Sequence, residues 1–118
     1  MTQAIVLAFT LKGQDQNKII EKIKEASVKY ADHLCIHGFM TRKEVVEKKL
    51  PTDILDAIET YFPKRANFYV KGPLRQEMCE WAKLVNAIVV IIGEVKEGVQ
   101  EEYNLYMAAG LNIVNIPL

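Results

Sequence analysis

The sequence predicts an α/β fold in which helices cover both faces of one central, mainly parallel sheet of five strands, giving three layers. Three observations lead to this prediction. Short apolar runs rich in Ile and Val alternate with segments of helical periodicity along the chain. The run at 87–92 is apolar throughout, as in a strand covered on both faces. Glycines follow several of these runs, where a strand would turn into a helix.

The first predicted elements are two strands separated by a helix. An apolar run at 3–9 forms the first strand. A polar turn at 10–15 then leads into a helix, for which Asp15 or Asn17 is the capping residue. The second strand is the run at 33–37, in which apolar and polar residues alternate.

The segment 39–50 is harder to place. Thr41 and Glu44 have the spacing of a capping box, which opens a short helix, and Pro51 breaks that helix. A second helix begins near Thr52. The sequence leaves open whether the short helix is a lid over a site or only a connection.

The rest of the chain continues the alternation. We predict strands at 66–70, 86–92 and 113–117, and helices at 74–85 and 99–109. The first of these helices carries an apolar stripe that we interpret as core packing, formed by Leu74, Met78, Trp81 and Val85. The order β-α-β-α-β-α-β-α-β implies a parallel sheet with right-handed crossovers. We therefore predict a single Rossmann-like domain over residues 1–118.

Charge and hydropathy narrow the classes of partner. Lys plus Arg equals Asp plus Glu, so the formal net charge is zero, whereas nucleic-acid and membrane-surface proteins depend on excess positive charge. No apolar run approaches the roughly 20 residues that span a bilayer, and the N-terminus has no signal-peptide pattern. We therefore expect a cytoplasmic protein that binds neither nucleic acid nor membranes.

The cysteines and histidines do not form a metal-binding pattern. Cys35 and Cys79 each lie in an apolar run, which favours buried free thiols. His33, Cys35 and His37 would share one face of a strand, but three ligands on a flat strand splay apart. We expect no metal ion and no cofactor.

The carboxyl ends of parallel strands share one rim, where ligands bind in α/β sheets. The residues that the predicted turns deliver to this rim include Thr10, Gly13, Gly38, Gly72, Arg75, Gly93 and Gly98. Glycine allows close approach of a ligand, although tight turns also need it, and Arg75 could bind an anionic group. The GxGxxG fingerprint and the Walker phosphate loop are both absent from the sequence.

Glu101 and Glu102 lie in the first turn of the helix that begins at Val99. Positions 102, 105 and 109 share one face of that helix, and Leu105 and Ala109 are apolar. Glu102 should therefore overhang the rim, whereas Glu101 points sideways. A carboxylate at the rim can attack an anomeric carbon or stabilise an oxocarbenium-like transition state. The alternative is that both residues only complement the helix dipole.

Segments in the C-terminal third carry a resemblance to a known family: 86–93, Gly98-x-x-x-Glu102, Ala109-Gly110 and 114–117. Together they resemble the C-terminal half of nucleoside 2-deoxyribosyltransferase-like proteins, and the wider group that includes LOG-type nucleoside monophosphate phosphoribohydrolases. In the first family the Gly-x-x-x-Glu turn carries the catalytic carboxylate, and Glu102 occupies that position. In the second group an arginine and a methionine on the preceding helix matter, and Arg75 and Met78 have a comparable arrangement.

This resemblance implies a nucleoside or nucleotide ligand and chemistry at its N-glycosidic bond, by a hydrolase or a deoxyribosyltransferase, with Glu102 as the nucleophile. The ligand-binding residues would be Thr10, Gly13, Gly72, Arg75, Gly93, Gly98 and Glu101. Two alternatives stay open: a non-catalytic nucleotide sensor on the same fold, and an oligomerising interaction protein. No helix follows the last predicted strand, and we expect a homo-oligomer because that edge is uncovered.

Overall fold

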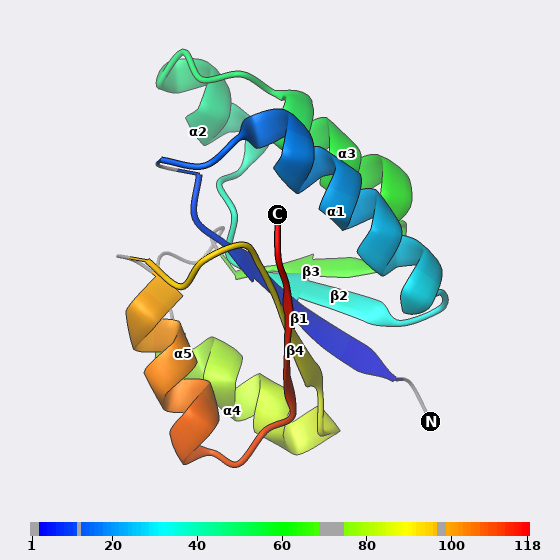
Figure 1. Ribbon diagram of the computed structural model, residues 1–118, viewed down its shortest axis with the longest axis vertical. Coiled ribbons are helices and arrows are strands. Elements are labelled where there is room, and N and C mark those ends of the chain that lie inside the picture. The colour runs from blue at the N-terminus through cyan, green and yellow to red at the C-terminus, as the bar shows by residue number, and fades with distance from the viewer. Residues whose placement is uncertain (1–2, 12, 69–74, 97–98) are drawn as a thin grey trace.

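A computed structural model of the protein describes residues 3–11, 13–68, 75–96 and 99–118. Over these residues, five parallel strands form one sheet in the order β3-β2-β1-β4-β5 (Figure 1). The strands are β1 (Ala4–Phe9), β2 (Leu34–His37), β3 (Arg65–Asn67), β4 (Ile88–Ile92) and β5 (Ile113–Ile116). The helices are α1 (Gln16–Lys29), α2 (Arg42–Glu47), α3 (Asp53–Tyr61), α4 (Arg75–Val85) and α5 (Val99–Ala108). The predicted Rossmann-like α/β fold is confirmed.

The sheet is the middle of three layers. Helices α1 and α3 cover one face, and α4 and α5 cover the other (Figure 1). Strand β1 shows why both faces are apolar: Ile5 and Leu7 pack toward α1 and α3, whereas Val6 and Ala8 pack toward α4 and α5. All four side chains are buried, as expected for a central parallel strand.

The helix starts follow from local hydrogen bonds. Of the two capping residues that the sequence offered, Asp15 and Asn17, the structure has Asp15. Its Oδ1 accepts from the backbone N–H of Asn17 at 2.9 Å. Thr41 caps α2, where its Oγ1 accepts from the N–H of Glu44 at 3.3 Å. These bonds satisfy amide groups that have no partner within the helix.

Two predictions from the sequence, one about a strand and one about a helix face, differ from the structure. The strand predicted at 66–70 is observed as β3, Arg65–Asn67, and residues 69 and 70 lie outside the described residues. The core stripe predicted on α4 is wrong at Trp81, whose side chain is 42% exposed and packs edge-on against Phe68. Met78 is in the core as predicted, together with Cys79 and Ala82, and Val85 packs against them partly buried. Leu74 lies outside the described residues.

The strand order places a switch point between β1 and β4. The chain runs outward from β1 through β2 to β3, then returns through α4 to build β4 and β5 on the other side of β1. Leu7 of β1 therefore lies between His37 of β2 and Val90 of β4. The carboxyl ends of these strands are where ligands bind in open α/β sheets.

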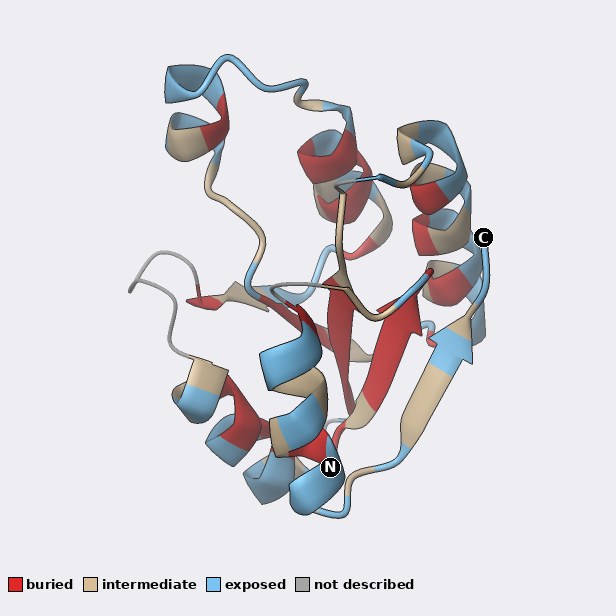
Figure 2. Ribbon diagram, turned by 60° about the vertical axis from the view of Figure 1, so that its left-hand side comes forward, coloured by how far each residue is buried: buried red, intermediate tan, exposed pale blue. Residues whose placement is uncertain are grey.

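The two edges of the sheet differ from its centre. Figure 2 shows the central strands as buried, whereas β5 is intermediate to exposed along its length.

None of the helices in the described part of the chain is long and apolar enough to cross a membrane.

Candidate functional site

A small hollow lies at the carboxyl ends of β1 and β2, beneath the start of α5. Its volume is about 200 Å³. Its lining residues come from three separate stretches of the chain: Leu7, Ala8, Phe9, Thr10, Gly38, Phe39, Val99 and Glu102. We call it the Glu102 hollow. It contains three of the residues that the sequence placed at the rim, Thr10, Gly38 and Glu102.

The carboxylate of Glu102 is partly buried in this hollow. Burial raises its pKa above the ordinary value for glutamate, and the positive charge of Arg75 partly opposes that shift. Within the described residues no hydrogen bond or ion pair engages the Glu102 side chain. Within this described part of the chain, the carboxylate therefore has no partner to displace before it acts on a ligand.

Thr10 brings a second uncommitted polar group to the hollow. Its Oγ1 is buried and has no hydrogen-bond partner among the described residues. A buried hydroxyl without a partner costs about 1–3 kcal/mol, so most native structures avoid one. Because Thr10 lines the same hollow as Glu102, a bound ligand could supply the missing hydrogen bond.

Glu101 and Arg75 form an ion pair beside the hollow. Arg75 Nη1 lies 2.9 Å from Glu101 Oε2, and the Glu101 side chain is 72% exposed. Consecutive residues on a helix face different directions, so Glu101 turns to α4 and solvent while Glu102 turns inward. The structure thus places Arg75 near Glu102 but pairs it with Glu101.

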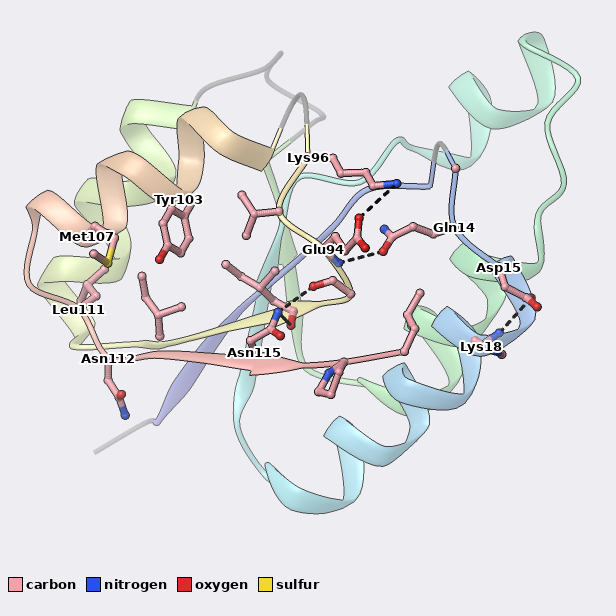
Figure 3. Close-up of a pocket in the computed structure, with 17 residues that line it drawn as sticks. Gln14, Asp15, Lys18, Glu94, Lys96, Tyr103, Met107, Leu111, Asn112 and Asn115 are labelled. Atoms are coloured by element: carbon pink, nitrogen blue, oxygen red, sulfur yellow. Dashed lines mark hydrogen bonds and ion pairs between the residues drawn. The ribbon is translucent and has the colours of Figure 1, made fainter.

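A second and larger cavity lies on the other side of the connection that follows β4. Its volume is about 910 Å³, and its walls are the start of α1, the residues after β4, α5 and the edge strand β5 (Figure 3). We call it the edge cavity. Gly13 and Gly93 line this cavity, so the structure does not bring them into the Glu102 hollow.

Gln14 closes the crevice between β1 and β4. Its side-chain amide donates to the carbonyl of Thr10. It also accepts from the N–H of Glu94 at 2.9 Å (Figure 3). The amide lies directly over Gly93, whose φ is +78°. Position 93 therefore needs glycine for its own turn and for Gln14, which accounts for this glycine without a ligand.

The start of α1 is already occupied by its own capping residue. Asp15 Oδ1 accepts from the backbone N–H groups of Asn17 and Lys18, at 2.9 and 3.4 Å. These are the amide groups that would otherwise bind an anion at a helix start. The amide groups at the start of α1 are thus less available to an anion, and Gly13, predicted as a ligand-binding residue, lies beside this capped start. Two further predicted site residues, Gly72 and Gly98, lie outside the described residues.

Three functional candidates were not singled out from the sequence. Phe39 lines the Glu102 hollow and packs against Phe9, with ring centroids 5.5 Å apart. Gln14 closes the neighbouring crevice. Tyr106 lies one turn after Glu102 on α5 and is completely buried, without a partner for its hydroxyl among the described residues. The sequence could have indicated Tyr106, because residues four apart on a helix are neighbours and Tyr106 is four residues after Glu102.

Each histidine ring contacts the backbone two residues away, and neither cysteine forms a disulfide. His33 Nδ1 lies 3.2 Å from the carbonyl of Ala31, and His37 Nδ1 accepts from the N–H of Phe39 at 3.3 Å. Both cysteines are free and buried. Among the described residues, no group of three His, Cys, Asp or Glu side chains could hold a metal ion.

Fold and site together define a Rossmann-like α/β domain with a partly buried carboxylate, unpaired among the residues that the structure describes, at the start of the helix after its fourth strand. No family model, curated protein or solved structure matches this chain. Any function must therefore be argued from the hollow and the residues around it.

Proposed function

We propose that the protein binds a nucleoside or nucleotide and breaks or transfers its N-glycosidic bond, with Glu102 acting at the anomeric carbon. The observation that carries this proposal is the pairing of groups in the Glu102 hollow. A partly buried carboxylate and the buried hydroxyl of Thr10 line the same space, and both lack partners among the described residues.

The size of the hollow suggests how the ligand lies. About 200 Å³ is less than the roughly 300–1,000 Å³ of sites that enclose a whole drug-sized ligand. We therefore place the pentose in the hollow and the base at its mouth. Phe39 provides an aromatic wall there, and aromatic faces stack well on bases.

The reaction needs only groups at this site and the substrates. Ionised Glu102 attacks C1′ of the sugar, the C1′–N bond breaks, and the base leaves with the bonding electron pair and takes up a proton from solvent water. Water or a second base then attacks C1′, the bond between C1′ and Glu102 breaks, and the attacking molecule gives up a proton to solvent, so that Glu102 is released as a carboxylate. The Thr10 hydroxyl would hydrogen-bond to the sugar and hold C1′ in front of the carboxylate.

Arg75 is the candidate for an anionic group on the ligand. Its ion pair with Glu101 is largely exposed on the Glu101 side, and such pairs contribute only about 0–1 kcal/mol. A ligand phosphate could replace Glu101 at little cost and would bind the guanidinium at two points. If Arg75 binds this phosphate, the protein should prefer nucleotides to nucleosides.

The test is release of free base from a panel of nucleosides, deoxynucleosides and nucleotides, measured by chromatography with and without an acceptor base. We expect Glu102→Gln to abolish turnover while ligand-induced thermal stabilisation persists. Glu80→Gln, an exposed carboxylate on α4, is the matched control and should retain full activity. Full turnover by Glu102→Gln would overturn the assignment of the nucleophile.

A non-catalytic nucleotide sensor is the second candidate, because the carboxylate of Glu102 and the hydroxyl of Thr10 line the same hollow and can hydrogen-bond to a ligand without breaking a bond in it. The same panel separates the two functions. Thermal stabilisation without base release, changed only modestly by Glu102→Gln, would support the sensor.

We also propose that a second copy of the chain covers the β5 edge. The sequence of β5, Ile113–Ile116, contains no charged residue, whereas β3 at the other edge begins with Arg65. Exposed edge strands are usually protected by charge, and an uncharged one invites pairing. Light scattering should give a dimer mass, and a monomer at high protein concentration would contradict this part of the proposal.

A further inference from the structure

The outer edge of β5 presents backbone groups that the sheet does not use. The N–H of Val89 donates to the carbonyl of Asn112, so the backbone of Asn112 faces β4. Because successive residues of a strand direct their backbone groups to opposite sides, Ile113 and Asn115 point theirs away from β4. β5 is the last strand of the sheet over the described residues, and nothing in that part of the chain pairs with these groups.

The surroundings of this edge suit a second strand that is itself uncharged. Residues 111–118 contain no charged side chain, so two copies of this segment can meet without like-charge repulsion. Two apolar side chains that line the edge cavity are open to solvent, Met107 at 56% and Leu118 at 39%. Figure 3 shows Met107 and Tyr103 of α5 beside this cavity. A strand laid along β5 would remove apolar surface from water here.

We propose that two copies of β5 pair in antiparallel directions about a two-fold axis, with Val114 opposite Val114 of the second copy, so that the two sheets become one. This inference rests on the proposed dimer and goes beyond it by fixing direction and register. In this register the outward N–H and C=O groups of Ile113 meet those of Asn115 in the second copy, and all of them are bonded. A shift of two residues either way leaves some of these groups without a partner in the strand.

The same pairing completes a wall of the edge cavity. Ile113 and Asn115 both line this cavity, on the face of the sheet that α5 covers. Side chains that lie opposite one another in an antiparallel pair share one face of the sheet. The partner's Ile113 would therefore lie beside Asn115 and join the cavity wall. The edge cavity is then a site formed by two copies of the chain.

Disulfide cross-linking tests the register directly. The two copies of Val114 form a non-hydrogen-bonded pair, with Cα atoms about 4.5 Å apart, within the roughly 4.4–6.8 Å that a disulfide spans. We expect Val114→Cys to become almost entirely a covalent dimer in a glutathione redox buffer, as seen on a non-reducing gel. Ile113→Cys and Asn115→Cys should not cross-link, because each position lies two residues out of register with its own copy, beyond about 7 Å.

Val28→Cys is the matched control for cysteine exposure. Val28 is a more exposed valine, at 75%, and lies on α1 outside β5. This variant should not cross-link, and neither should the wild type, whose Cys35 and Cys79 are buried. Cross-linking of Ile113→Cys or Asn115→Cys in place of Val114→Cys would mean a different register and would overturn the inference.

A charge swap at the same position needs no disulfide and covers the case in which Val114→Cys does not fold. Val114 is only half-buried, so a charged side chain is tolerated there in a single copy. Val114→Lys places two like charges opposite each other, and so does Val114→Glu. Each variant alone should be a monomer by light scattering with an unchanged circular dichroism spectrum, and an equal mixture of the two should form a dimer. Dimers of both variants alone would place the contact elsewhere.

The outcomes separate the register from the proposed dimer and from the proposed reaction. A wild-type dimer that Val114→Cys does not cross-link and Val114→Lys does not dissociate would overturn the register and keep the dimer. A wild-type monomer in which Val114→Cys does not cross-link would overturn both and leave this edge to a strand of another protein. Base release tests the reaction independently, because Glu102 lines the other hollow.

Discussion

The side-chain amide of Gln14 lies so close to the backbone of Gly93 that a methyl group at position 93 would collide with it. The same amide joins the end of β1 to the turn after β4 through its bonds to Thr10 and Glu94. Asn115 holds Gly93 from the other side, donating to its carbonyl at 2.7 Å. The crevice at the switch point is thus filled by the protein's own side chains, and the candidate site lies to one side of it.

Replacement of Gly93 by alanine should destabilise the protein more than the same change at Gly110. Both glycines have positive φ, +78° and +72°, which costs alanine about 1–2 kcal/mol. Only at Gly93 would the new methyl also displace Gln14, because nothing lies within 4 Å of the corresponding position at Gly110. Urea denaturation should therefore give a larger loss for Gly93→Ala, by about 1 kcal/mol or more.

A double-mutant cycle shows whether Gln14 causes that difference. In a Gln14→Ala background, the cost of Gly93→Ala should fall to about that of Gly110→Ala, since the collision is gone and only backbone strain remains. Equal costs of Gly93→Ala with and without Gln14 would contradict the packing described here.

His37 should make the protein less stable as the pH falls from about 6.5 to about 4. Burial, and then the nearby charge of Arg65, lower the pKa of His37 from 6.5 to about 4. In this pH window the unfolded chain binds a proton that the folded protein does not bind, so the free energy of unfolding falls as the pH falls. Over this whole pH window, the free energy of unfolding should fall by about 3 kcal/mol because of His37.

The measurement is urea denaturation across this pH range for the wild-type protein and for His37→Asn. Asparagine does not titrate and keeps an acceptor for the N–H of Phe39. The variant should lose less stability on acidification than the wild type. Equal losses in both proteins would show that His37 is not the group responsible.

Glu102→Gln should stabilise the folded protein at neutral pH and not at acidic pH. The pKa of Glu102 is raised in the folded state, so the folded state binds a proton more readily than the unfolded chain. The wild type therefore loses stability as the pH rises above the ordinary glutamate pKa of about 4.3 and through the folded-state pKa. Glutamine removes that loss.

Denaturation of Glu102→Gln at pH values on either side of this window gives the test. Glu101→Gln serves as the control, because its exposed ion pair with Arg75 contributes about 0–1 kcal/mol and its carboxylate is not buried. A gain in stability for Glu101→Gln but not for Glu102→Gln would mean that Glu101, and not Glu102, is the carboxylate that burial destabilises.

Both cysteines should resist thiol reagents while the protein is folded. Burial raises the pKa of Cys35 to about 12 and also raises that of Cys79, so neither forms much thiolate near neutral pH. A disulfide reagent such as Ellman's should label both residues in denaturant but only slowly in the native protein. Rapid labelling of the folded protein would show that one of these thiols is accessible.

The sequence determined the order and type of the elements, because apolar periodicity and turn residues act locally. It also separated Glu102 from Glu101, since the helical period alone turns position 102 toward Leu105 and the core. The parallel sheet followed from the alternation of strands and helices. For the same local reason, Thr41 could be expected to begin α2, and it does.

Tertiary structure decided what the rim contains. The sequence predicted one rim, but Gly13 and Gly93 line the edge cavity while Thr10 lies with Glu102. The side chain of Gln14 causes part of this division, through a contact between residues 80 positions apart. Such contacts depend on where β1 and β4 meet in space, and periodicity along the chain does not record that. Trp81 is exposed for a similar reason, because the face of α4 that meets the sheet is chosen by the packing of α5 and β1 against it.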